Sequence, residues 1–376
     1  MTLSRRIYPG AVIGIIGGGQ LGKMLAQSAL RMGYKVAVLD PSEDAPAKAT
    51  SDLFINAAFD DEAALKQLGD ASDIITYEFE NIDGPLLKRM VDEYYVPQGA
   101  ETLLTLQNRE TEKDAVRNSG AKVVPFEKVS GDGDVKAFAE QEGWPVIVKT
   151  ATGGYDGKGQ YLVESEDDLE KEPIPYGDTQ FIAEKYLDLE REVSLTVARS
   201  ADGKTIVFPL QENLHRNQIL YRTIAPSRID RQKDAEAEVE KIMNKLHFAG
   251  VFTVEFFIDK SGELYVNEIA PRPHNSAHHT IESCNISQFD AHILALTNQP
   301  MPEIRQHKRA VMMNLLGQDL DRLGDALYDH PEWHVHLYGK SARKPERKMG
   351  HMTILTDDVE DTLEKLKTDF EKEGQA

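Results

Sequence analysis

Two glutamates stand on either side of a predicted turn in the segment FTVEFFIDKSGELYVNEIAPRPHNSAHHT, residues 252–280. The turn signal DKSG separates two apolar strands, and a hairpin closed there places Glu255 and Glu268 on one face, directly or diagonally opposite each other. Facing carboxylates repel unless a cation lies between them. Mg²⁺, which takes a few carboxylates together with nucleotide phosphates, is the expected occupant; solvated glutamates on an exposed face are the alternative.

Other polar side chains of the same segment favour a binding site. Asn267 adds an oxygen ligand only if the strand is locally twisted, because strict alternation points it away. Three histidines, His274, His278 and His279, raise the possibility of zinc. Their spacing fits no familiar zinc pattern, and the carboxylates already favour a hard cation.

A second candidate site is the glycine-rich segment WPVIVKTATGGYDGKGQYLV, residues 144–163. Lys149 ends an apolar strand, and a loop rich in glycine and containing Lys158 leads into another strand. Glycines permit close backbone approach and lysines neutralise charge, so the segment suits a flap over polyphosphate. It is not a Walker loop, because no G-K-[ST] leads into a helix. A hairpin with ordinary surface lysines is the alternative.

A third glycine-rich stretch, VIGIIGGGQLG at residues 12–22, contains G-x-G-x-x-G directly after a predicted strand. The next strand ends at Asp40, about where a ribose-binding carboxylate lies in a dinucleotide site. These residues alone favour an NAD-dependent dehydrogenase of the Rossmann type. A tight strand-to-helix turn without a ligand is the equal alternative.

Composition limits the partners. The chain has 63 acidic and 43 basic residues and a net charge of −20, which disfavours nucleic acid. Its only cysteine, Cys284, excludes an intramolecular disulfide framework and a cysteine-rich metal site. The N-terminal apolar stretch is short and glycine-broken, so it predicts a core strand rather than a secretion signal. With no apolar run of membrane-spanning length, a cytoplasmic protein without a membrane partner is expected.

The elements that must position these residues fall into three parts, as a length of 376 residues favours. Strand and helix patterns alternate through about residue 95, which predicts a doubly wound parallel α/β domain at residues 1–108. An α+β domain follows at residues 109–300, and a small β-rich domain at residues 301–376.

Four motifs carry a resemblance to a known family: GGGQLG, TGGYDGKGQ, NEIAPRPHNSAHHT, and HLYGK followed by RKMGHMT. They match in order over essentially the whole chain. The chain resembles the ATP-grasp superfamily and, within it, the N5-carboxyaminoimidazole ribonucleotide synthetases of purine biosynthesis. One departure is visible, because Ala277 stands where the family pattern leads us to expect glycine.

The resemblance implies an ATP-grasp architecture, with the α/β domain first, a two-lobed ATP-binding domain in the centre and the small domain last. It implies ATP and Mg²⁺ as cofactors, and 5-aminoimidazole ribonucleotide and bicarbonate as substrates. The implied reaction is carboxylation of the 5-amino group through carboxyphosphate, by a homodimer. Glu255 and Glu268 would hold the magnesium, and Arg272 and Lys149 would stabilise the transferring groups. Asp156 would accept or orient the amine proton.

The resemblance also assigns the binding residues. The aminoimidazole ribonucleotide site would be made by Gln20, Leu21, Glu78, Tyr155, Asp156, Arg272 and His274, with Lys340 and Arg347 on its 5′-phosphate. The segment FIAEKYL would be an edge strand whose backbone reads adenine, and Glu192 would bind ribose. The ATP site would comprise Arg109, Lys149, Gly154, Tyr155, Asp156, Gly157, Lys158, Gly159, Gln160, Glu184, Lys185, Tyr186, Leu187, Glu192, His215, Asn267 and Glu268.

One rival shares this scaffold. A formate-dependent glycinamide ribonucleotide transformylase would use the same acyl-phosphate chemistry, but it would lack the HLYGK and RKMGH segments that form the predicted phosphate clamp.

Overall fold

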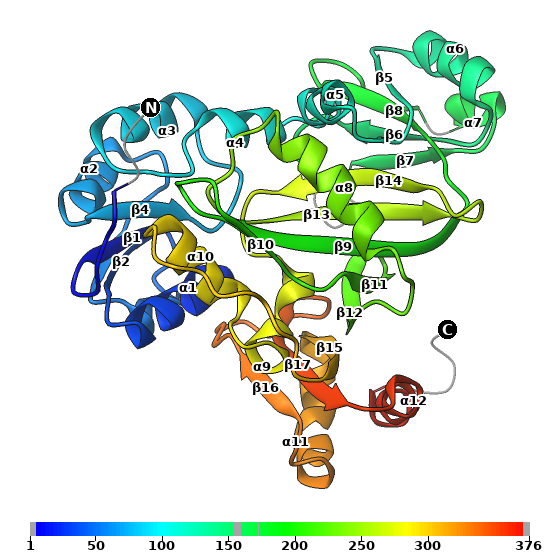
Figure 1. Cartoon of the computed structure of the whole chain (residues 1–376). Helices are drawn as coiled ribbons and strands as arrows, with labels where there is room; N and C mark the ends of the chain where they lie inside the picture. The colour runs from blue at the N-terminus through cyan, green and yellow to red at the C-terminus, as the bar shows by residue number, and fades with distance from the viewer. Residues whose placement is uncertain (1–4, 154–158, 172, 371–376) are drawn as a thin grey trace.

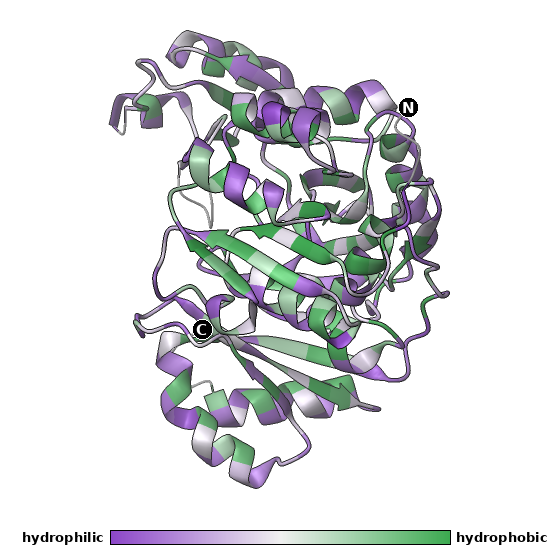
Figure 2. Ribbon diagram, turned by 90° about the vertical axis from the view of Figure 1, so that its left-hand side faces the viewer, coloured by the Kyte–Doolittle hydropathy of each residue, from purple (hydrophilic) through white to green (hydrophobic). Residues whose placement is uncertain are grey.

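The structure is a computed structural model that describes residues 5–153, 159–171 and 173–370. The N-terminal part, the central part with its two lobes, and the C-terminal part surround a common centre (Figure 1). Green apolar segments run along the strands of the interior, whereas the outer helices alternate green with purple (Figure 2). No described helix is both long enough and apolar enough to cross a membrane.

The N-terminal part is a parallel four-stranded sheet with the order β3-β2-β1-β4. Helix α1 covers one face, and α2 and α3 cover the other, so the strands are buried from both sides. The predicted doubly wound α/β domain is therefore confirmed. Its elements are β1 (Val12–Ile16), α1 (Gln20–Arg31), β2 (Lys35–Asp40), η1 (Lys48–Thr50), β3 (Leu53–Asn56), α2 (Glu62–Asp70), β4 (Ile74–Tyr77) and α3 (Gly84–Glu93).

The smaller central lobe is an antiparallel sheet with the order β5-β8-β6-β7. The expectation of an edge strand at FIAEKYL was wrong, because β8 pairs with β5 on one side and β6 on the other. Its apolar side chains Phe181 and Ala183 are buried in a core that includes residues of the helices Asp132–Glu142 and Glu166–Lys171. The elements here are α4 (Glu101–Leu106), α5 (Arg109–Ser119), β5 (Phe126–Val129), α6 (Asp132–Glu142), β6 (Val146–Thr150), β7 (Gln160–Val163), α7 (Glu166–Lys171) and β8 (Phe181–Lys185).

The larger lobe is built on an antiparallel sheet with the order β14-β13-β9-β11-β12-β15-β17-β16, and β10 pairs with β9. Strands β15, β17 and β16 belong to the C-terminal part, yet they extend this sheet through the β12–β15 pairing. The third predicted domain thus has no separate sheet, and the three domain boundaries stay predictions.

The elements of this lobe and of the C-terminal part are β9 (Leu189–Arg199), β10 (Thr205–Val207), β11 (Gln211–Arg216), β12 (Ile219–Ala225), α8 (Gln232–Met243), β13 (Gly250–Asp259), β14 (Leu264–Ala270), η2 (Asn275–Ala277), α9 (Thr280–Ser283), α10 (Gln288–Leu296), β15 (Arg309–Leu316), η3 (Gly317–Asp319), α11 (Leu320–Asp329), β16 (His334–Leu337), β17 (Lys348–Thr356) and α12 (Val359–Phe370).

Helix α10 joins the N-terminal sheet to the large sheet, and buried His292 is its polar link. Its Nδ1 accepts the Val251 N–H at 2.9 Å, so its Nε2 carries the proton and donates to the Thr76 hydroxyl at 2.9 Å. The hydroxyl in turn donates to Gln98 at 2.6 Å. This series of hydrogen bonds connects β13 with β4. Later residues of β13 and the residues directly after β4 contribute to the site described below.

Replacing His292 tests this link. Burial lowers the pKa of His292 to about 3, so the folded protein keeps it neutral. Its stabilising effect is therefore complete above the unfolded-state pKa of about 6.5 and is lost as the pH falls toward 3. We expect His292→Leu to lower the free energy of unfolding by about 2–4 kcal/mol at pH 8, because it strands the Val251 N–H. The deficit should shrink at pH 5, measured by thermal unfolding.

The exposed His247 is the matched control, and His247→Leu should leave the unfolding midpoint within about a degree of the wild type. A deficit in His292→Leu that is equally large at pH 8 and pH 5 would show that His292 is not buried in its neutral form.

Candidate active site

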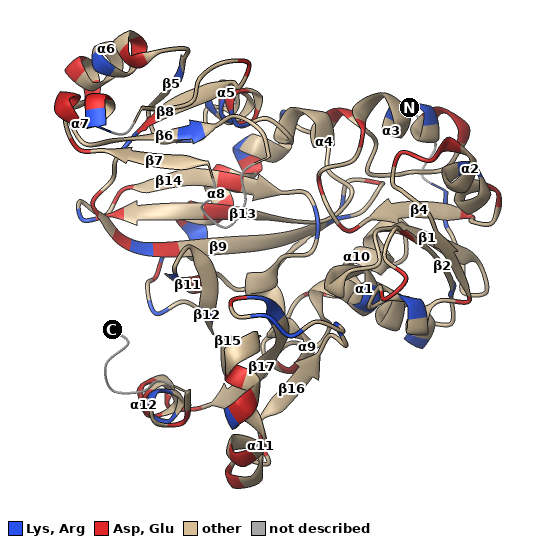
Figure 3. Ribbon diagram, turned by 180° about the vertical axis from the view of Figure 1, so that it is seen from behind, with Lys and Arg blue, Asp and Glu red and all other residues tan. Residues whose placement is uncertain are grey.

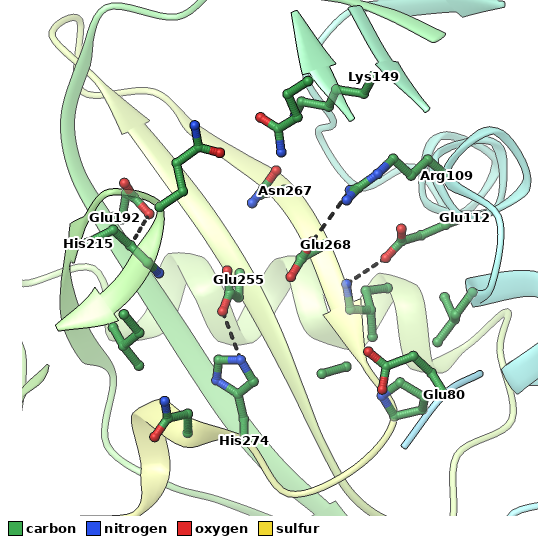
Figure 4. A pocket seen from close by; sticks show the side chains of 18 of the residues that line it. Glu80, Arg109, Glu112, Lys149, Glu192, His215, Glu255, Asn267, Glu268 and His274 are labelled. Atoms are coloured by element: carbon green, nitrogen blue, oxygen red, sulfur yellow. Dashed lines mark hydrogen bonds and ion pairs between the residues drawn. The ribbon is translucent and has the colours of Figure 1, made fainter. Parts of the chain in front are cut away.

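A cavity of about 710 Å³ lies where the small lobe, the large sheet and the N-terminal sheet meet. Figure 4 shows side chains converging on it, with Lys149 and Arg109 on one side and Glu255 and Glu268 in the middle. Acidic and basic groups are crowded here within a small volume. The site is therefore defined by which acidic group lies beside which basic group.

The carboxylate pair sits on the β13–β14 hairpin. Glu255 and Glu268 are direct partners in the strand register, which is one of the two arrangements that the turn signal left open. The next pair is Phe256 with Val266, so Asn267 is an extra residue in a β-bulge. The bulge breaks the alternation of side chains, and both Asn267 and Glu268 line the cavity. The sequence predicts Asn267 as an oxygen ligand only if the strand is locally twisted, and the bulge supplies that twist.

Each carboxylate of the pair faces a nitrogen-bearing side chain. Glu255 Oε1 lies 3.0 Å from His274 Nε2, and Glu268 Oε2 lies 3.5 Å from Arg109 Nη1. Burial alone would raise the pKa of Glu255, but His274, by its charge and hydrogen bond, holds that pKa below its ordinary value. The oxygens of Glu255, Glu268 and Asn267 on one surface are the donor set that Mg²⁺ prefers, so these residues fit the ion.

Two lysines are held in the opposite wall by one buried carboxylate. Lys149 Nζ lies 2.7 Å from Glu184 Oε2, and Lys113 Nζ lies 3.2 Å from Glu184 Oε1. Burial raises the pKa of Glu184, but the two ammonium charges outweigh it and lower that pKa to about 2. The side chain of Glu184 is thus a counter-ion for the lysines. The assignment of Glu184 to Leu187 to the adenine stays a prediction.

The predicted ribose residues form a pair of their own. Glu192 on β9 and His215 on β11 place carboxylate Oε2 and imidazole Nδ1 2.7 Å apart. Burial lowers the pKa of His215, but the adjacent carboxylate outweighs it and raises that pKa. Both residues line the cavity, together with Tyr186 and Leu187.

The glycine-rich turn after β1 binds carboxylates of the chain itself. Glu78 accepts hydrogen bonds from the N–H groups of Gly19 and Gly22, and Asp40 accepts from Gly18 at 2.7 Å. A Cβ at Gly19 would stand 2.6 Å from the Glu78 carboxylate. The glycines therefore allow close packing against Glu78, and the amides that a dinucleotide would need are occupied. The dehydrogenase hypothesis loses its main support here.

The residues predicted for the aminoimidazole ribonucleotide divide into two groups. Those that line the cavity are Gln20, Leu21, Glu78, Arg272 and His274. Lys340 and Arg347 do not line it; they lie in the loop between β16 and β17, which carries basic residues beside α9 (Figure 3). Burial and the charges of Arg347 and Lys348 lower the pKa of Lys340 to about 8.

The glycine-rich flap is described only at its ends. Gly154, Tyr155, Asp156, Gly157 and Lys158 lie outside the described residues. Gly159 accepts a hydrogen bond from the Thr150 N–H at 2.9 Å, and Gln160 lines the cavity.

Four charged residues of the cavity or its wall were missed from the sequence: Glu80, Glu112, Lys113 and Lys348. Glu112 and Lys113 follow the predicted Arg109 by three and four positions on α5, and this helical spacing was a usable signal. Burial and the nearby Glu268 raise the pKa of Glu112 to about 8, and its Oε1 accepts the Ile269 N–H at 2.6 Å. The other two offered no such signal, because tertiary folding alone brings them to the cavity.

Comparisons with known proteins agree with this geometry. Residues 114–289 match the ATP-grasp domain, residues 11–107 the ribonucleotide synthetase preATP-grasp domain, and residues 310–365 the phosphoribosylaminoimidazole carboxylase C-terminal domain. The N5-carboxyaminoimidazole ribonucleotide synthase of Staphylococcus aureus strain N315 is 56% identical over 363 residues, covering 96% of this chain and 97% of that protein.

Two solved structures are similar over nearly the whole chain. N5-carboxyaminoimidazole synthetase from Staphylococcus aureus complexed with ADP has a TM-score of 0.95 at 55% identity, covering 97% of this chain and 98% of that one. The Aspergillus clavatus enzyme in complex with ADP and 5-aminoimidazole ribonucleotide has a TM-score of 0.88 at 29% identity, covering 96% and 97%.

The fold and the site therefore define an ATP-grasp ligase. Within that class, the chain belongs to the family of N5-carboxyaminoimidazole ribonucleotide synthases. The predicted architecture, with a preATP-grasp domain, an ATP-grasp domain and a family-specific C-terminal domain, is confirmed.

The carboxylate pair makes a direct prediction about metal-dependent nucleotide binding. We expect Glu255→Gln and Glu268→Gln each to weaken Mg²⁺-dependent ATP binding by about 100-fold or more, because each removes a charged oxygen ligand. Isothermal titration calorimetry at fixed Mg²⁺ measures this. Glu263→Gln is the control, since Glu263 lies at the far end of the same hairpin and pairs with Lys122. Wild-type affinity in both cavity variants would refute the metal assignment.

Proposed function

We propose that the protein uses ATP and bicarbonate to carboxylate the 5-amino group of 5-aminoimidazole ribonucleotide, giving N5-carboxyaminoimidazole ribonucleotide in de novo purine biosynthesis. The observation that carries the proposal is the layout of one cavity. Its lysines and carboxylate pair lie on the ATP-grasp lobes, whereas Gln20, Leu21 and Glu78 reach it from the N-terminal sheet. A nucleotide held by the lobes and a second substrate held beside the N-terminal sheet would thus lie on either side of Arg272.

The charges of the cavity suit ATP at the lobe side. Lys149, Lys113 and Arg109 would neutralise the phosphates, and Glu192 with His215 would hold the ribose hydroxyls. Glu255, Glu268 and Asn267 would hold Mg²⁺, whose chemistry here is to shield the charge of the phosphates. The relative complexed with ADP supports an adenine nucleotide as ligand.

The proposed reaction has two steps. A bicarbonate oxygen attacks the γ-phosphorus of ATP, the bond from that phosphorus to the β-bridging oxygen breaks, and carboxyphosphate and ADP form. The bond from the carboxyl carbon to the phosphate oxygen then breaks, and the 5-amino nitrogen bonds to that carbon, either in carboxyphosphate or in the CO₂ released from it. Phosphate leaves and takes up the proton that the amine loses. Arg272, Lys149 and Arg109 would stabilise the oxyanions of both steps. The chain otherwise positions the partners and excludes water, because carboxyphosphate decomposes rapidly in water.

The second substrate would lie between the β1–α1 turn and the C-terminal loop. Gln20, Leu21, Glu78 and His274 would surround the imidazole and ribose, and Lys340 with Arg347 would bind the 5′-phosphate. The relative bound to ADP and 5-aminoimidazole ribonucleotide supports such a site. The roles of Tyr155 and Asp156, the homodimer and the cytoplasmic location stay predictions.

The phosphate clamp is testable by kinetics. We expect Lys340→Ala and Arg347→Ala each to raise the KM for aminoimidazole ribonucleotide by about 10- to 100-fold, because each removes one charge-assisted contact worth about 1.5–3 kcal/mol. The KM for ATP should change less than about twofold, because the clamp lies outside the nucleotide cavity. Lys308→Ala, which removes a surface pair with Asp357, is the control. An equal rise in both KM values would place the clamp elsewhere.

Isotope transfer tests the chemistry. The oxygen that attacks phosphorus stays with phosphate when the carbon-to-oxygen bond breaks. We therefore expect ¹⁸O-labelled bicarbonate to deliver one oxygen into inorganic phosphate in early samples, read by mass spectrometry before bicarbonate exchanges with water. Unlabelled phosphate formed while the bicarbonate is still labelled would exclude carboxyphosphate. A requirement for formate and glycinamide ribonucleotide would instead indicate the transformylase.

A further inference from the structure

Arg272 is held by a carboxylate that comes from a different part of the fold. Its Nε donates to Glu80 Oε2 at 2.5 Å and its Nη2 donates to Glu80 Oε1 at 2.9 Å. Glu80 follows β4 of the N-terminal sheet, whereas Arg272 follows β14 of the large sheet. The contact is a two-point ion pair across the junction of the two sheets, and both side chains line the cavity.

The guanidinium group of Arg272 has five N–H groups in one fixed plane. Its hydrogen bonds to described residues leave two of these N–H groups over. Glu80 takes the side edge formed by Nε and Nη2. Nη1 donates one hydrogen to the carbonyl of Pro273 at 3.3 Å. Among the described residues no other hydrogen bond to Arg272 is formed. One N–H on Nη1 and one on Nη2 are thus left, and together they can present the end edge of the guanidinium to an oxyanion.

Glu80 is itself fixed, so it can set the orientation of its partner. Gln107 Nε2 donates to the carbonyl of Glu80 at 2.6 Å and to that of Ile82 at 2.7 Å, which ties this loop to the start of the ATP-grasp lobe. The neighbouring Phe79 packs its ring against Phe59, with centroids 4.5 Å apart. A carboxylate on so constrained a loop holds the arginine plane with little loss of entropy on binding.

We propose that Glu80 is a positioning residue for the carboxylation: it holds the side edge of Arg272 so that the end edge receives the oxyanion of bicarbonate and then of carboxyphosphate. This inference rests on the proposed function. A planar guanidinium end edge matches the two oxygens of a carboxylate, and a held arginine needs no reorganisation when the substrate arrives. Glu80 also spans the junction, so the site for the small substrate depends on both sheets being in place.

Kinetics of Glu80→Gln test the proposal. The amide keeps the size of the side chain but offers one acceptor and a repelling NH₂, so the two-point pair is lost. We expect the KM for bicarbonate to rise about tenfold or more, while the KM for ATP stays close to the wild type. Glu62→Gln is the matched control, because Glu62 pairs with Arg89 at 2.6 Å on the surface of the N-terminal part.

A double-mutant cycle separates positioning from a purely structural role. Lysine cannot offer two edges, so in an Arg272→Lys background Glu80→Gln should change the KM for bicarbonate less than about twofold. Additive effects, a lowered KM for bicarbonate, or a rise confined to the KM for aminoimidazole ribonucleotide would overturn the proposal. If the wild type shows no bicarbonate-dependent turnover, the proposed function fails instead, and the two failures are distinguishable.

Discussion

The site depends on one irregularity, the β-bulge at Asn267 in the β13–β14 hairpin. A regular ladder would turn either Asn267 or Glu268 away from Glu255, because side chains alternate across a strand. The bulge lets both face the cavity while the hydrogen-bonded register brings the two glutamates opposite each other. Arg109 and His274 lie next to Glu268 and Glu255 of this cluster, and burial together with Glu268 raises the pKa of the neighbouring Glu112.

Counter-ions explain how so many charges share one buried volume. Glu184 holds Lys149 and Lys113, Glu80 holds Arg272, and the amides of Gly19 and Gly22 bind Glu78. Removing one member of such a buried pair costs more than the pair itself contributes, because the other charge is left without a partner. Each cationic side chain is therefore already held in place by a carboxylate before an anionic substrate binds. A chain with a net charge of −20 can bind a nucleotide in this way.

Local patterns predicted the parts whose geometry is local. The turn signal DKSG predicted the hairpin, although not the bulge that makes Glu255 and Glu268 direct partners, and alternating strand and helix patterns predicted the parallel N-terminal sheet. The glycine-rich turn was ambiguous, because glycine permits close approach of any group and here that group is Glu78, 59 residues from Gly19. β8 was mistaken for an edge strand because its neighbour β5 is about 50 residues earlier. Glu80 could not be found at all, since its partner Arg272 lies 192 residues away.

The stoichiometry of turnover tests the central claim, that one cavity couples ATP cleavage to carboxylation of the amine. The measurement follows ADP, inorganic phosphate and acid-labile ¹⁴C from labelled bicarbonate in the same reaction with aminoimidazole ribonucleotide. The account predicts equal amounts of all three products and negligible ADP when either bicarbonate or aminoimidazole ribonucleotide is left out. ADP formation that proceeds at the full rate without bicarbonate, with no ¹⁴C fixed, would contradict it.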